Sequence, residues 1–118
     1  MSIEIKKTSR KFTEVEQYLM TIAPSIISLK DVPDGEKITV DGVLIFTDTK
    51  DATGEAVDIM SIITPDKKVY SCQSATFKRS IEDISAIMNS KQFTVEKVSG
   101  KTKAGRAFIN CVLDITSL

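Results

Sequence analysis

The chain has 118 residues, of which 42% are apolar and 27% are charged, and its 16 basic and 16 acidic side chains cancel. These values are typical of one globular domain, and no apolar run approaches the roughly 20 residues that a membrane span requires. The sequence has no histidine, which removes the commonest general base, and it lacks the glycine motifs that bind nucleotide phosphates. We therefore expect a cytoplasmic protein that is not an enzyme and that uses no cofactor or metal.

The charges are unevenly distributed along the chain. Residues 1–35 are neutral, residues 36–64 carry a net charge of −4, and residues 65–118 carry +4. Such a distribution can build a positive face opposite a negative one. The fold can equally cancel this polarity by bringing the opposite charges together.

Residues 1–35 are predicted to form an extension that contains one short helix. Residues 3–6 alternate in polarity and indicate a short strand. Thr13 and Glu16 have the spacing of a capping box, and Pro24 ends the helix. A short helix is marginal alone in water, so its apolar stripe should pack on the rest of the domain. The stripe consists of Val15, Tyr18, Leu19 and Ile22.

The remaining residues, 36–118, alternate between strand and helix periodicity. Strands are predicted at 37–48, 56–64 and 69–74, and a closing hairpin at 92–98 and 106–115. Gly42 interrupts the first strand and indicates a bend, which allows this strand to serve two sheets. A helix with Thr76 or Ser80 as its cap is predicted between the third and fourth strands. Its apolar stripe is Phe77, Ile81, Ile84 and Met88.

The order β-β-β-α-β-β is that of a mainly β, five-stranded OB-fold barrel, here with an additional short N-terminal helix. Closure removes the exposed edges of an open sheet, and the helix plugs one end of the barrel. A small open sheet packed by two helices and an SH3-like barrel are the alternatives. The whole chain, 1–118, is predicted to be one domain, in which Cys72 and Cys111 are buried small hydrophobic residues.

The predicted hairpin carries charge of one sign. No acidic residue lies between Glu96 and Asp114, whereas this stretch contains four basic residues, Lys97, Lys101, Lys103 and Arg106. A nucleic-acid backbone is the simplest partner for such a tip, and an inert solvated turn is the alternative. In an OB barrel, the loop between the last two strands flanks the groove that binds oligonucleotides.

Single-stranded nucleic acid is bound by cations that follow the phosphates and by aromatic faces on which bases stack. Tyr70 is the best stacking candidate, with a core tyrosine as the alternative, and the face of Phe108 is ambiguous. The acidic loop around Asp48, Asp51 and Glu55 would repel a backbone that shared its groove. The predicted nucleic-acid-binding residues are Lys67, Lys68, Tyr70, Lys78, Arg79, Lys101, Lys103 and Arg106.

Three stretches resemble the small single-stranded DNA-binding proteins encoded by tailed phages of lactic-acid bacteria: 59–71 (IMSIITPDKKVYS), 74–80 (SATFKRS) and 98–106 (VSGKTKAGR). The resemblance implies an OB-fold, self-association, and binding of single-stranded DNA with little sequence preference. It also implies a part in phage replication or recombination, where the protein protects or presents the strand and meets other phage proteins. The N-terminal helix and the apolar run 26–29 are candidates for a self-association surface, or for a cover on the barrel. The alternative function is a protein-interaction module of OB type whose basic hairpin binds an acidic protein.

Overall fold

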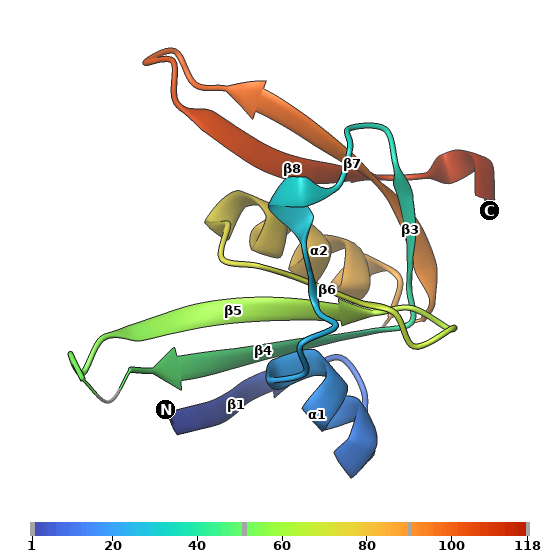
Figure 1. Ribbon diagram of the computed structural model, residues 1–118. Coiled ribbons are helices and arrows are strands. Elements are labelled where there is room, and N and C mark those ends of the chain that lie inside the picture. Colours follow the sequence, from blue (N-terminus) through green and yellow to red (C-terminus); the bar gives the residue numbers. More distant parts are fainter. Residues whose placement is uncertain (1, 51, 90, 118) are drawn as a thin grey trace.

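A computed structural model describes residues 2–50, 52–89 and 91–117, which form two sheets, two α-helices and two short 3₁₀ helices (Figure 1). No helix in these described ranges is long and apolar enough to cross a membrane. In chain order the elements are β1 (Ser2–Thr8), α1 (Glu14–Thr21), β2 (Ile27–Ser28), η1 (Leu29–Asp31), β3 (Lys37–Val40), β4 (Gly42–Thr49), β5 (Ala56–Ile63), β6 (Val69–Cys72), α2 (Ala75–Ile87), β7 (Phe93–Lys101), β8 (Ala107–Leu113) and η2 (Ile115–Ser117).

The first sheet has the strand order β1-β4-β5-β6-β2, and the second has the order β3-β7-β8. All neighbouring strands are antiparallel except β2, which runs parallel to β6. The mainly β class predicted from the sequence is therefore confirmed. Neither sheet closes on itself within the described residues, because the partner of β6 on its outer edge is β2 and not β8.

One stretch of chain serves both sheets, as the glycine in it predicted. Its first half, β3, pairs with β7, and its second half, β4, pairs with β1 and β5. The break between the halves lies at Asp41, directly before Gly42, and the backbone of Gly42 is covered by the ring of Phe12. A Cβ atom on Gly42 would stand 2.6 Å from two carbons of that ring. A side chain is therefore excluded at the point where the strand bends.

The substitution Gly42→Ala is expected to lower the free energy of unfolding by about 1 to 3 kcal/mol, the usual cost of overpacking a filled site. Urea denaturation measures this change. If the clash is with the ring, Phe12→Leu in the same chain should recover part of the loss, so that the two effects are not additive. An unchanged midpoint for Gly42→Ala would show that the ring can move aside at no cost.

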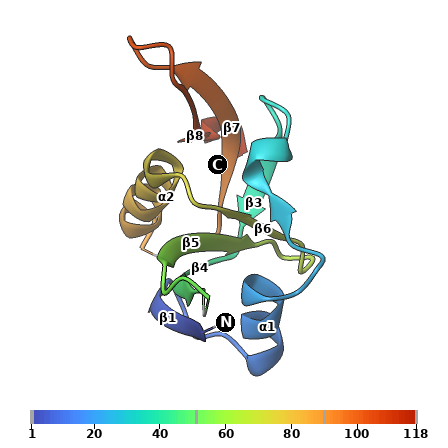
Figure 2. The ribbon, with the colours of Figure 1, turned by 60° about the vertical axis from the view of Figure 1, so that its left-hand side comes forward.

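The first sheet is covered on both faces, by α1 on one and by α2 with the second sheet on the other (Figures 1 and 2). Leu44 and Phe46 belong to the apolar cluster that contains Met20 of α1, whereas Val43 and Ile45 belong to the cluster on the other face. Successive residues of a strand point to opposite faces. A strand that is covered on both sides therefore reads as the continuous apolar run seen at 43–46.

The buried face of α1 differs from the predicted one. Thr13 caps the helix as predicted, but the side chain of Glu16 is buried. The prediction that the apolar stripe packs on the domain is wrong for three of its members, Val15, Tyr18 and Ile22, which are 67%, 50% and 52% exposed. The helix is rotated so that a carboxylate faces inward, where it meets two cations contributed by other segments.

The stripe of α2 is confirmed, since Phe77 and Ile81 are fully buried and Ile84 and Met88 pack against the same cluster. The predicted cap is wrong by at least two residues. Ser74 is the cap, and its hydroxyl accepts the Phe77 N–H at 3.2 Å. This position places the start of α2 directly after β6.

Cys72 and Cys111 are free and buried, as predicted. Burial raises the pKa of the Cys72 thiol to about 11 and that of the Cys111 thiol to about 12. Both thiols are therefore protonated at neutral pH and serve as small apolar residues.

Candidate nucleic-acid interface

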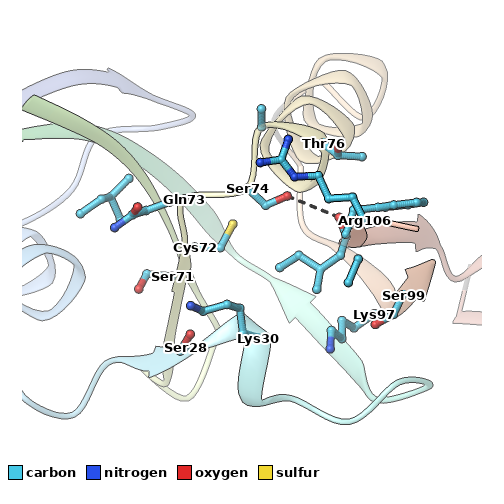
Figure 3. Close-up of a pocket in the computed structure, with 15 residues that line it drawn as sticks. Ser28, Lys30, Ser71, Cys72, Gln73, Ser74, Thr76, Lys97, Ser99 and Arg106 are labelled. Carbon is cyan, nitrogen blue, oxygen red and sulfur yellow. Dashed lines mark hydrogen bonds between the residues drawn. The ribbon is translucent and has the colours of Figure 1, made fainter. Parts of the chain in front are cut away.

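A groove of about 830 Å³ lies where the two sheets separate (Figure 3). One wall is the end of β6 with the start of α2, residues 71–76, and the other is the hairpin formed by β7 and β8. Ser28 and Lys30, from β2 and η1, and Ile59 of β5 complete the lining. The groove therefore lies between the strands β6 and β8, which are not paired with each other in the described structure.

The lining contains cations and hydroxyl groups but no carboxylate, although 16 residues of the chain are acidic. The three charged residues are Lys30, Lys97 and Arg106. The N-terminus of α2 adds the partial positive charge that every helix carries at this end. The uncharged hydrogen-bonding residues are Ser28, Ser71, Gln73, Ser74, Thr76 and Ser99.

Alternation along β7 determines what the hairpin presents to the groove. Lys97 and Ser99 line the groove, and Lys101 lies on the same face of the strand two residues further on. Beyond it the tip is closed by two backbone hydrogen bonds, from Thr102 N–H to the Arg106 carbonyl oxygen and from Gly105 N–H to the Thr102 carbonyl oxygen, with Gly105 at φ +83°. The hairpin therefore carries a row of polar and cationic side chains out from the groove to the tip.

Lys97 is the unusual cation, because its side chain is only 5% exposed. Its Nζ donates to the Val32 carbonyl oxygen at 2.6 Å and lies 3.3 Å from a carboxylate oxygen of Asp34. Ser99 donates its hydroxyl hydrogen to the same Asp34 oxygen at 2.6 Å. These contacts fasten residues 32–34 to the hairpin wall.

Five of the eight predicted binding residues lie in or near the groove. Arg106 lines it, and Lys101 and Lys103 are exposed at the hairpin tip. Lys78 and Arg79 follow the groove-lining start of α2 but are not part of the lining. Within the part of the chain that the structure describes, none of these five has an acidic partner, whereas Lys6, Lys7, Arg10, Lys37, Lys67 and Lys97 all have one.

Lys67 and Lys68 are not brought to this site. They lie in the turn between β5 and β6, which is well separated from the hairpin tip in both views (Figures 1 and 2). Lys67 Nζ pairs with Glu16 at 2.9 Å, and Lys68 Nζ stands 5.9 Å from the centre of the Tyr70 ring. The groove and this turn are therefore separate surfaces.

The two aromatic side chains considered for stacking, Tyr70 and Phe108, are poorly placed to stack on a base. Tyr70 is only 6% exposed and belongs to the core, which was the alternative for this residue in the sequence. Phe108 borders the groove, but it pairs with Gly100 across the hairpin, and its ring lies so close that a Cβ on Gly100 would meet it at 2.6 Å. Gly100 and Phe108 share the face of the hairpin opposite to Lys97 and Ser99.

Of the 15 residues that line the groove, the predicted binding residues include Arg106 alone, and the two other lining cations, Lys30 and Lys97, were missed. Lys97 could have been found from the sequence, because it lies four residues before Lys101 on the same strand and therefore on the same face. Lys30 had no such signal, since it reaches the groove through the two-residue strand β2 and the turn η1. Asp48 and Glu55 are outside the lining, so the repulsion expected from their loop does not arise there; Asp51 lies outside the described residues.

No three His, Cys, Asp or Glu side chains gather in the described residues as a metal ion would require.

Searches of curated proteins and of solved structures returned no match. A family model described as phage single-stranded DNA-binding protein matches residues 7–114, which include both walls of the groove. The chain therefore belongs to the phage single-stranded DNA-binding protein family.

Proposed function

We propose that the protein binds single-stranded DNA in the groove between the hairpin and the start of α2, with little preference for sequence. The observation that supports this most is the charge of the lining, which contains no carboxylate and two cations, Lys30 and Arg106, that have no acidic partner among the described residues, in a chain of zero net charge. Membership of a single-stranded DNA-binding family supplies the ligand class. Phosphates are the part of DNA that such a lining recognises, and they are the same in every sequence.

The proposed mechanism is mainly electrostatic. Lys30 and Arg106 would hold phosphates within the groove, while Lys101 and Lys103 extend the contact along the hairpin. The bases would meet aliphatic side chains of the walls, such as Ile59 and Ile109, because the ring of Tyr70 is buried and cannot stack on them. Aromatic stacking is therefore expected to contribute less than in proteins with open aromatic platforms.

The fold is best interpreted as an opened OB barrel. The bent β3–β4 stretch, β5, β6, α2, β7 and β8 follow the OB order, and the groove lies between the third and fifth of these strands. The tip of the β7–β8 hairpin corresponds to the loop that flanks the oligonucleotide site in OB folds. Residues 2–31 would then add β1 and β2 to the two edges of the first sheet.

Titration of fluorescent oligothymidylate, followed by anisotropy at several salt concentrations, tests this function. Binding should weaken with salt by about 0.7 in log K per log salt for each phosphate contact. Oligodeoxycytidylate and mixed strands should bind within a few fold, and unlabelled strands should compete. Failure of unlabelled oligothymidylate to displace a bound acidic protein partner would instead support a protein-interaction module.

We also propose that copies of the protein associate and act in phage replication or recombination in the host cytoplasm, as the family resemblance implies. Light scattering with and without oligothymidylate measures the first part of this proposal. A monomer in both conditions would remove it while leaving the groove untouched.

A further inference from the structure

One carboxylate is bound by groove residues as though it were a ligand. Asp34 Oδ1 accepts the Ser99 hydroxyl at 2.6 Å and lies 3.3 Å from Lys97 Nζ. Figure 3 shows Lys97 and Ser99 beside each other on the hairpin wall. An ammonium and a hydroxyl that converge on one carboxylate oxygen can equally donate to one oxygen of a phosphate.

The Lys97 ammonium is fixed, whereas the carboxylate is movable. Lys97 is buried in β7, and its ammonium keeps a further hydrogen bond to the Val32 carbonyl oxygen. The side chain of Asp34 is 59% exposed. The backbone beside it is held independently, because Gly35 N–H donates to Lys97 O at 2.8 Å and Lys97 N–H donates to Glu36 O at 3.0 Å. The side chain of Asp34 can therefore rotate into solvent while the turn stays in place.

We propose that Asp34 is a resident anion which competes with a DNA phosphate for Lys97 and Ser99 at the groove wall. This inference rests on the proposed function. The hydrogen bond from Ser99 and the contact with Lys97 hold the pKa of Asp34 below its usual range, so the carboxylate is charged at neutral pH. Its charge compensates buried Lys97 in the free protein, and a phosphate takes its place in the complex.

Asp34→Asn tests the inference, because it keeps an acceptor for both donors and removes only the charge. Oligothymidylate is expected to bind roughly threefold more tightly at 50 mM salt, with a salt slope steeper by about 0.7, the value of one added phosphate contact. A purely structural latch predicts the opposite, since weakening it would loosen the groove and lower the affinity. Unchanged or weaker binding by Asp34→Asn overturns the inference.

The matched control is Asp31→Asn, an exposed carboxylate three residues earlier in the chain. It should leave the slope unchanged; an equal steepening in both variants would show a general charge effect and also overturn the inference. Ser99→Ala should weaken binding more in the Asp34→Asn chain than in the wild type, because a neutral asparagine competes with the phosphate for the hydroxyl less strongly than a carboxylate does. Asp34→Ser carries the same prediction if urea unfolding shows that the asparagine variant is poorly folded.

The two proposals fail in different ways. Wild-type binding that does not depend on salt removes the groove as a phosphate site altogether. Salt-dependent wild-type binding with no gain in Asp34→Asn removes only the role of Asp34.

Discussion

Replacing Lys101, Lys103 and Arg106 together by alanine is expected to weaken oligothymidylate binding about 30- to 100-fold at 0.1 M salt, because three phosphate contacts are lost. The slope of log K against log salt should become shallower by about 2. All three side chains are exposed, and none has an acidic partner among the described residues. The fold should therefore be unaffected, which thermal unfolding checks.

The matched control removes the same charge elsewhere. Lys6, Lys11 and Lys50 are exposed and outside the groove lining. Their joint replacement by alanine should change the affinity by less than about threefold, since distant exposed charges are largely screened at this salt concentration. Equal losses in the two triple variants would mean that net charge, and not the hairpin, drives binding.

The substitution Glu16→Gln is expected to lower the free energy of unfolding by about 2 to 3 kcal/mol, because it removes the buried charge that pairs with two cations, whereas the amide oxygen can still accept the Thr13 N–H. Glu16 Oε2 lies 2.9 Å from both Arg10 Nη2 and Lys67 Nζ, and Oε1 accepts the Thr13 N–H at 3.0 Å. Arg10 also pairs with Asp41 at 3.0 Å. One carboxylate therefore joins α1, the β3–β4 bend and the β5–β6 turn.

The effect of this substitution should depend on pH. Hydrogen bonds from Arg10, Thr13 and Lys67 hold the pKa of Glu16 well below its usual range. A group whose pKa is lowered on folding stabilises the folded state above its unfolded pKa of about 4.3, and this contribution is lost as the pH falls further. Urea denaturation should therefore show the full difference between wild type and Glu16→Gln at pH 7 and a smaller one below about pH 4.

Glu14→Gln is the control for Glu16, because Glu14 is exposed in the first turn of the same helix. It should cost less than about 0.5 kcal/mol. Equal losses for the two variants, or a Glu16→Gln difference that does not shrink in acid, would contradict the role given to this carboxylate.

The sequence predicted correctly those features that are determined by residues close together along the chain. The β-branched runs predicted strands, Gly42 predicted the bend, and the spacing of Phe77 and Ile81 predicted the buried face of α2. The exposed face of α1 could not be predicted in this way. Val15 and Tyr18 are as apolar as core residues, and the inward rotation of the helix depends on cations from residues 10 and 67, which only the tertiary fold brings together.

The part of the site whose cations lie close together in the sequence was predicted. The part that is assembled from separate elements of the fold was missed. The hairpin cations are neighbours along the chain, so their shared surface was visible. Lys67 looks equally available in sequence, yet it pairs with Glu16, 51 residues away. Lys30 is brought to the groove by the parallel pairing of Ile27 and Ser28 with β6, a two-residue contact that leaves no sequence pattern.

Ultraviolet crosslinking of the full-length protein to oligothymidylate, followed by mass spectrometry of the attached peptides, tests most directly whether the DNA lies in the groove. Crosslinks are expected on both walls, within residues 71–76 and 97–109, and they should disappear in the presence of excess unlabelled strand. Crosslinks confined to the β5–β6 turn or to α1, with both walls unmarked, would contradict the account.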